Sequence, residues 1–591
     1  MSADWKILKV NLSDGSIRSE RVPEAWVASL LGGKGMAAAY LYREVPPKAD
    51  PLGPENRLIL MAGPLVGLAP GCSRYCVTTK SPLTGAFLDA YSGGHFPAHL
   101  RFALPDHLGV VVEGRAKELT VLRIDGGRAY LESASNLKGR SARDISEAFP
   151  EYKSAAIGPA GENLVRFATV SNDGGTHHAG RAGAGAVMGS KKLKAILVRG
   201  TPLQDARIGS LRKQLLDRMA HGEGQAGVRA NGTPGMVTVS NEAGTLPTRH
   251  WTKGSFAGIE GLSVDVFHRN QKSRVACYLC PIACGFNLEF TEGAYEGLVT
   301  GKGPEYETVG MMGSNLELGD LSAVAKLGCA CDELGLDTIS AGNVLGFAME
   351  CVEKGILDEP VHFGNSEEAL RILEKIAARD GIGDLLAEGT RTAAAELGGG
   401  AEMSAVEVKG LELPAWGPRA SHSMALAYAT SDRGACHMRS WAVGGDAFGP
   451  RDPFAFDPEH AAAVIADQNG SSVLWSLISC AFSGFDHDDA AKWLDALGYE
   501  TTREDLDVIG ERIWNLTRLF NVREGFGRDD QFPVRLTTQP LQDGGPADGR
   551  IVDAEILKDL VRSYYEQREW SQDGVPSSRK LASLELEPFA R

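Results

Sequence analysis

Short apolar runs bounded by glycine, proline or aspartate dominate the first third of the chain. Runs of about four to eight apolar and β-branched residues between such turn residues are typical of β-strands. The runs lie at residues 5–12, 57–63, 109–114, 119–124 and 195–200. Glycine-rich connectors at 32–35, 92–94 and 180–185 allow a backbone to approach a ligand closely. The pattern predicts a β-rich domain over residues 1–205.

The hydrophobic pattern changes after residue 205. Apolar positions at three- and four-residue spacing predict amphipathic helices. Such segments are found at 321–334, 367–378, 460–466 and 554–566. A second break is expected in the Gly- and Pro-punctuated stretch 409–418. We therefore expect an α+β protein, with the β-rich domain followed by two mainly helical domains, 206–412 and 413–591.

Charge and composition narrow the classes of function. The net charge of −15 gives no electrostatic support for nucleic-acid binding. The N-terminus has no secretory leader pattern, and no run of about 20 apolar residues predicts a membrane span. Ten cysteines in 591 residues are too few for a disulfide scaffold. A cytoplasmic location is expected, where clustered cysteines bind metal or do redox work.

The sharpest local signal is the run Cys277-Tyr-Leu-Cys280-Pro-Ile-Ala-Cys284. Three thiolates at this spacing can converge on one small object, and soft thiolates select iron–sulfur clusters or zinc. No second cysteine pair follows as in common zinc sites, and a cluster often takes its fourth ligand from far away in sequence. An iron–sulfur cluster, a zinc ion and a purely structural grouping all remain open from spacing alone.

Several longer motifs occur along the chain in a fixed order. They lie at 80–85, 92–94, 180–194, 277–284, 303–308, 331–338, 428–437, 521–525 and 573–576. Together they resemble the aldehyde:ferredoxin oxidoreductase family over essentially the whole length. The resemblance implies a β-rich base that holds two pyranopterins and helical domains that close over them. It also implies tungsten or molybdenum held by the pterin sulfurs, and an adjacent 4Fe–4S cluster.

The resemblance assigns cofactor-binding residues. Arg74, Arg181 and Arg439 match cationic positions near the pterin phosphates, and Gly93, Ala182 and Gly183 match backbone contacts. A magnesium ion is expected to join the phosphates through the main-chain carbonyls of Tyr91 and Ala182, although Tyr91 departs from the usual asparagine. Asp332 and Asp337 match the carboxylates that accept pterin N–H groups. From the sequence alone, Asp337 also fits a helix cap.

The fourth cluster ligand implied by the resemblance is Cys480, joining Cys277, Cys280 and Cys284. Two residues in front of it depart from the family pattern. Trp475 stands in place of a pterin-binding aspartate, and Ile478 in place of a glycine. Some relatives bind a mononuclear iron between subunits through Glu-x-x-His. Here the stretch reads Lys326-Leu-Gly-Cys329, so we expect no such iron.

The resemblance also names catalytic groups. Glu307 matches the active-site carboxylate, which would act as general base on water or an aldehyde hydrate. His437 matches a histidine that hydrogen-bonds a metal oxo group or the substrate carbonyl. Glu305, His177 and His178 receive no role from the sequence.

The expected function is oxidation of aldehydes to carboxylic acids, with electrons passing through the cluster to ferredoxin or a ferredoxin-like subunit. The chain would work as a homodimer or in a heteromeric complex. One alternative is the tungsten subunit of a low-potential reductase acting on carboxylic acids or an aromatic acyl-CoA. Another is an iron–sulfur or zinc binding module without catalysis. The long glycine-rich first domain argues against the module, which would not need those loops.

Overall fold

The first third of the chain forms two six-stranded sheets in the computed structural model, which describes residues 4–455, 457–527 and 530–590. In spatial order the first sheet contains β2 (Ile17–Arg21), β1 (Lys6–Asn11), β6 (His107–Glu113), β3 (Leu58–Met61), β4 (Tyr75–Lys80) and β5 (Phe87–Ser92). The second contains β11 (His177–Ala179), β10 (Val170–Asn172), β9 (Lys153–Ala156), β12 (Leu193–Arg199), β7 (Thr120–Asp125) and β8 (Arg128–Ser133). Each sheet has one parallel pair, β1 with β6 and β7 with β12, among antiparallel ones.

All five predicted strands are present, as β1, β3, β6, β7 and β12. The prediction missed the other strands of both sheets, among them β4 and β5, where polar residues such as Lys80 and Asp89 interrupt the apolar pattern. Both side chains are buried and find their partners far away in sequence. The Lys80 ammonium is 2.8 Å from the Glu524 carboxylate, and Lys34 is 3.1 Å from Asp89. Buried charges of this kind require such pairing.

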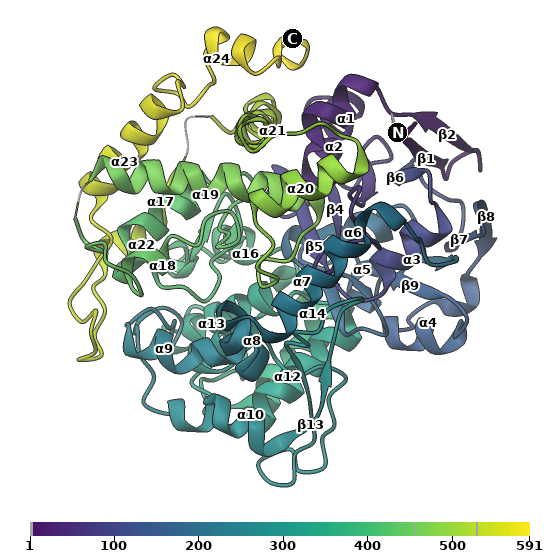
Figure 1. Cartoon of the computed structure of the whole chain (residues 1–591). Coiled ribbons are helices and arrows are strands. Elements are labelled where there is room, and N and C mark those ends of the chain that lie inside the picture. The colour runs from purple at the N-terminus through teal and green to yellow at the C-terminus, as the bar shows by residue number, and fades with distance from the viewer. Residues whose placement is uncertain (1–3, 456, 528–529, 591) are drawn as a thin grey trace.

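Helices make up most of the chain after β12 (Figure 1). The four predicted helical segments lie in α12 (Leu321–Leu334), α14 (Ser366–Ala378), α19 (Pro458–Leu477) and α23 (Ala554–Gln567). Other helices are α2 (Gly33–Glu44), α6 (Ala184–Ser190), α7 (Gly209–His221), α8 (Ala226–Asn231), α9 (Met236–Glu242), α11 (Tyr306–Met312), α13 (Thr338–Glu353), α17 (His422–Thr430), α20 (His487–Leu497) and α21 (Arg503–Arg523). The α+β class with a β-rich first part is confirmed.

The hydrophobic core joins the first third of the chain to the last. Helix α2 packs between β3 and β4 of the first sheet and the helices α19 and α21. One continuous core cluster therefore contains Met36 and Leu41 together with Val473 and Ile513. The division at residues 205 and 412 stays a prediction, because core clusters contain residues from both sides of each boundary.

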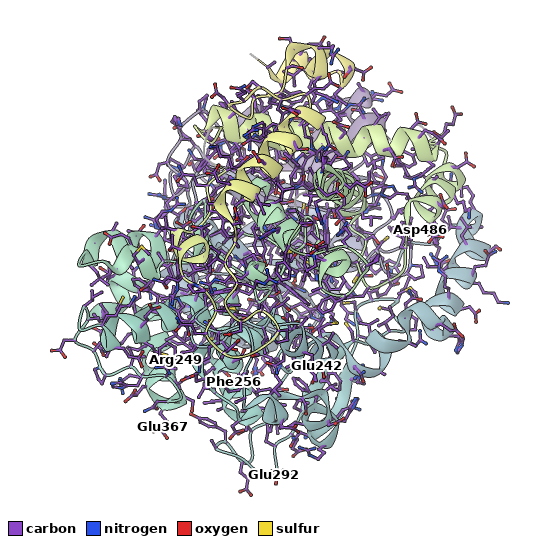
Figure 2. The ribbon with its side chains drawn as sticks, turned by 90° about the vertical axis from the view of Figure 1, so that its left-hand side faces the viewer. Glu242, Arg249, Phe256, Glu292, Glu367 and Asp486 are labelled. Atoms are coloured by element: carbon purple, nitrogen blue, oxygen red, sulfur yellow. The ribbon has the colours of Figure 1, made fainter. Side chains whose placement is uncertain are left out.

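The middle and last thirds are also tied together by a surface loop. In Figure 2 the yellow C-terminal loop descends towards the labelled Arg249 and Phe256. Its Asp543 carboxylate accepts the backbone N–H groups of Gly254 and Ser255 at 2.6 and 2.8 Å. None of the helices in the described ranges has the length and apolar character that a membrane span requires.

Candidate active site

A cavity of about 270 Å³ lies where the first sheet meets the helical part of the chain. Its wall includes the four cysteines predicted to hold a cluster, Cys277, Cys280, Cys284 and Cys480. Within the described ranges, no three His, Cys, Asp or Glu side chains form a site for a single metal ion. The cavity is large enough to hold a group bigger than one water molecule.

Tight loops present these cysteines. The first three lie between β13 (Gln271–Val275) and β14 (Gly285–Leu288), where Leu279 and Ala283 adopt left-handed backbone conformations with φ of +53° and +47°. Cys480 follows the end of α19, where Ile478 has φ +62°. A left-handed residue at a helix end is usually glycine. Ile478 therefore keeps the turn that the expected glycine would favour.

Cationic and neutral donors surround the thiols. Arg74 donates a hydrogen bond from Nη2 to Cys480 Sγ at 3.2 Å, and the Gly94 N–H donates to Cys277 Sγ at 3.2 Å. A Cβ atom on Gly93 would lie 3.0 Å from Cys277 Sγ, so glycine allows this close approach. His177 Nε2 is 3.6 Å from the same sulfur. Burial lowers the pKa of His177 well below its usual range, so its imidazole is neutral.

The two aromatic departures from the family pattern touch each other. The rings of Tyr91 and Trp475 lie 4.4 Å apart between centroids, and the Arg74 guanidinium is 5.8 Å from the Trp475 ring. Tyr91 lines the cysteine cavity, whereas Trp475 lines a second and larger one. This aromatic pair therefore forms part of the boundary between the two cavities.

The predicted pterin-reading aspartates lie by a small third cavity of about 100 Å³. Asp332 Oδ1 is 3.0 Å from His178 Nε2, and Asp337 Oδ2 is 3.4 Å from Arg181 Nε. Asp337 is also the N-cap of α13, accepting the N–H groups of residues 339 and 340. The helix cap expected from the sequence is therefore present.

A glycine-rich loop from the first domain lies beside β5. Ala182 and Gly183 have φ of +65° and +90°, and a Cβ atom on Gly183 would lie 1.9 Å from the Arg166 carbonyl oxygen. The Ala182 carbonyl accepts a hydrogen bond from Ser81 Oγ at 2.8 Å. A carbonyl oxygen has a second lone pair, so it can still accept one further partner.

Arg439 does not line any of the three cavities, and its guanidinium lies 5.7 Å from the centre of the Tyr91 ring. Its guanidinium pairs with Asp89 and, at 3.0 Å, with Asp432. Lys34 pairs with the same two carboxylates, which makes a buried cluster of two cations and two anions. The four charges offset one another, and Lys34 and Arg439 hold the pKa of Asp432 well below its usual range despite its burial.

The second cavity, of about 690 Å³, contains the two predicted catalytic residues. Glu307 lies in the first turn of α11, and His437 follows α17. Aromatic and aliphatic side chains form much of the remaining wall, among them Met236, Trp416, Trp441, Leu474, Trp475 and Phe482. Glu307 and His437 lie on this largely apolar wall together with a few other polar residues, among them Glu305 and Asp467.

Burial shifts the pKa values of both Glu307 and His437. Burial raises the pKa of Glu307 to about 7, opposed by the Ala415 N–H bond at 2.7 Å and by the Arg181 charge. Burial lowers the pKa of His437 to about 3, helped by Arg181. Glu307 Oε1 and His437 Nδ1 are 3.4 Å apart, and neither has a hydrogen-bond partner among the residues that the structure describes. Both atoms are free to engage a bound molecule.

Three residues at these sites received no role from the sequence. Lys302 lines the cysteine cavity, Trp416 lies beside Glu307, and Arg433 donates to Cys436 Sγ at 3.0 Å. Two of them carried a local signal: Lys302 stands between two glycines at the start of the 303–308 motif, and Arg433 lies within the 428–437 motif, three residues before Cys436. Trp416 is positioned by contacts with residues distant in sequence, such as Tyr306.

Comparison with known proteins identifies the family. The model for the N-terminal domain of aldehyde ferredoxin oxidoreductase matches residues 7–200, and the model for its domains 2 and 3 matches residues 210–586. Tungsten-containing aldehyde ferredoxin oxidoreductases from Thermococcus kodakarensis and Pyrococcus furiosus are each 39% identical to this chain, over 100% of both proteins.

More distant relatives share the same architecture. An aliphatic sulfonate oxidoreductase WOR-like subunit from Pyrococcus furiosus is 29% identical over 98% of this chain and 96% of the relative. The active-site complex BamBC of benzoyl-coenzyme A reductase, solved with 1,5-dienoyl-CoA, matches with a TM-score of 0.85 and 28% identity, over 100% of this chain and 98% of that one. The chain belongs to the aldehyde ferredoxin oxidoreductase family and is an oxidoreductase.

Proposed function

We propose that this chain oxidises aldehydes to carboxylic acids at a tungsten–bis-pyranopterin centre, the cofactor that family membership implies. The observation that carries the proposal is the free Glu307–His437 pair, which faces an apolar cavity beside the four-cysteine cavity. Glu305 and Phe482 line both cavities, so proton chemistry and electron transfer would take place on two sides of one wall.

The residues present fit an anionic cofactor with phosphate groups. Four buried guanidinium nitrogens near the proposed site have no hydrogen-bond partner among the described residues, although one of them, Arg181 Nε, lies 3.4 Å from Asp337 Oδ2. They are Arg74 Nε, Arg181 Nε, Arg433 Nε and Arg439 Nη1. A buried donor without a partner is costly, so a ligand that accepts these bonds would be stabilised. Asp332 and Asp337 would accept hydrogen bonds from pterin N–H groups. The backbone at Gly93 and at Ala182–Gly183 would allow the cofactor to approach closely. The predicted magnesium ion at the Tyr91 and Ala182 carbonyls belongs to the same proposal.

A 4Fe–4S cluster on Cys277, Cys280, Cys284 and Cys480 completes the proposed electron path. Arg74 supports this role because it lies between Cys480 and the Trp475 ring, at the boundary of the two cavities. The acceptor would be ferredoxin or a ferredoxin-like subunit, in a homodimer or a heteromeric complex. A cytoplasmic location is part of the proposal.

The chemistry assigned to the chain's own residues is proton transfer and orientation. Bound tungsten would supply the two-electron oxidant. Ionised Glu307 would accept the proton of water or an aldehyde hydrate through Oε1. Neutral His437 would hydrogen-bond the substrate oxygen and hold the carbonyl beside Glu307. The apolar walls would exclude bulk water and keep the pKa of Glu307 near 7.

The alternative of a low-potential reductase keeps one specific support, the full-length match to the benzoyl-coenzyme A reductase complex at 28% identity. The aldehyde-oxidising relatives are closer, at 39%. We therefore place aldehyde oxidation first. The binding module without catalysis does not account for a free carboxylate–imidazole pair in an apolar chamber.

The test is the Glu307→Gln variant, assayed for aldehyde-dependent reduction of a viologen dye. We expect kcat to fall by about 10²–10⁴-fold, because the general base is lost. Tungsten, iron and pterin contents should stay at the wild-type values. Glu333→Gln, on the exposed face of α12, is the matched control and should keep full activity. A wild-type protein that turns over no aldehyde but reduces an aromatic acyl-CoA would contradict the proposal.

A further inference from the structure

An ion pair outside the assigned machinery lies between the three cavities. Lys302 Nζ is 2.5 Å from Glu305 Oε1. Lys302 lines the cysteine cavity and the small cavity by Asp332, and Glu305 lines both of these and the catalytic cavity. Both charges therefore face the proposed cluster, and neither is used by the chemistry of Glu307 and His437.

The pair is held firmly on both sides. Thr233 Oγ1 donates to Glu305 Oε2, and the Tyr306 N–H donates to Thr233 Oγ1 at 3.0 Å. On the other side, the Gly303 N–H donates to the Phe286 carbonyl oxygen at 2.6 Å. A Cβ atom on Gly285 would lie 2.9 Å from Lys302 Cε, so the lysine stem packs against the residue that follows Cys284. These anchors fix the ammonium beside the cysteine loop.

The other groups that face the thiols leave Lys302 a clear electrostatic effect. Arg74 is the second cation and donates to Cys480 Sγ at 3.2 Å. The Lys302 stem packs against Gly285, directly after Cys284, and both Lys302 and Glu305 line the cavity that the four cysteines share.

We propose that the Lys302–Glu305 pair sets the reduction potential of the cluster, an inference that rests on the proposed function. An electron entering a 4Fe–4S cluster adds one negative charge to it. A fixed ammonium nearby stabilises the reduced form and raises the potential, whereas a carboxylate lowers it. Neutralising the two residues one at a time must therefore shift the potential in opposite directions.

The test is a potentiometric titration of the anaerobically purified holoenzyme, followed by the EPR signal of the reduced cluster. Lys302→Met should lower the midpoint potential, with an equilibrium constant for reduction at least about tenfold smaller, or ~59 mV for one electron. Glu305→Gln should raise it. Lys302→Arg keeps the charge and should stay close to wild type. Opposite shifts in the two neutral variants would report on charge, because a purely structural effect would not change sign between them.

The outcomes separate this inference from the proposed function. If wild-type protein contains no cluster, the proposed function fails and the inference fails with it. If the cluster is present and both neutral variants shift the potential in the same direction or not at all, the inference alone is overturned. If Lys302→Met loses its cluster, Glu305→Gln decides: an upward shift supports the inference, and an unchanged or lower potential overturns it.

Discussion

The cysteine cavity and the catalytic cavity share Glu305 and Phe482 but differ in the other side chains that line them. Loops with left-handed residues present the thiols of the first cavity, and Arg74 and Lys302 supply positive charge beside them. The second cavity is enclosed largely by aromatic and aliphatic side chains, and it contains a carboxyl with a pKa of about 7 and a neutral imidazole. In the cysteine cavity, fixed charges would set the reduction potential of the proposed cluster. In the catalytic cavity, burial shifts the pKa values of Glu307 and His437.

Under the proposed function, this difference would separate electron transfer at the four cysteines from proton transfer at Glu307. A cluster that accepts electrons is stabilised by nearby cations, whereas a general base works best with a pKa near the working pH. The Arg181 charge already lowers the pKa of Glu307 against the effect of burial, and further cations beside it would weaken it as the proposed base. Tyr91, Trp475 and Glu305 lie at the boundary between the two cavities.

The largest expected effect is on the cysteine cavity. Cys480→Ser should remove the fourth thiolate, so iron should fall from about four atoms per chain to a small fraction and the EPR signal should disappear. Cys351→Ala, at a buried position in α13, is the control and should keep its iron. A Cys480→Ser protein with its full iron content would show that another residue holds the cluster.

A smaller effect is expected from pH at the catalytic cavity. Glu307 must be ionised to accept a proton, so kcat/KM should fall as pH drops below the pKa of about 7. The loss should approach about tenfold per pH unit on the acid side. His437, with a pKa of about 3, should add no limb between pH 5 and 8. An acid limb near the ordinary glutamate value would contradict the burial argument.

The smallest effect separates the two roles of Asp337. Asp337→Ser keeps a good N-cap, so the thermal midpoint should stay near wild type while pterin content falls. Asp337→Ala also loses the cap and should cost about 1 kcal/mol of stability. Thermal unfolding and pterin content of both variants check this expectation. If Asp337→Ser retains all of its pterin, the residue acts only as a cap.

The elements that the sequence predicted well are those whose pattern is local. The spacing of apolar residues marked α12 at 321–334, and the apolar runs marked the central strands. Strands β4 and β5 were missed because their buried polar residues are paired across the fold, as Lys80 is with Glu524. The local pattern of apolar and polar residues contains no information about a partner more than 400 residues away.

The candidate sites divide in the same way. The cysteine triplet was visible as a short motif, and Cys480 through the family resemblance; all four line one cavity. The Lys302–Glu305 pair and the contact between Tyr91 and Trp475 arise only when loops from different parts of the chain meet. The roles of Glu307, His437 and the pterin-reading residues stay predictions until measured.

The metal and pterin content of anaerobically purified protein decides whether the chain carries the proposed cofactors. We predict one tungsten, two pterins and about four irons per chain. Iron without tungsten or pterin, or zinc in place of iron, would contradict the account, and the roles proposed for Glu307 and His437 would then be withdrawn.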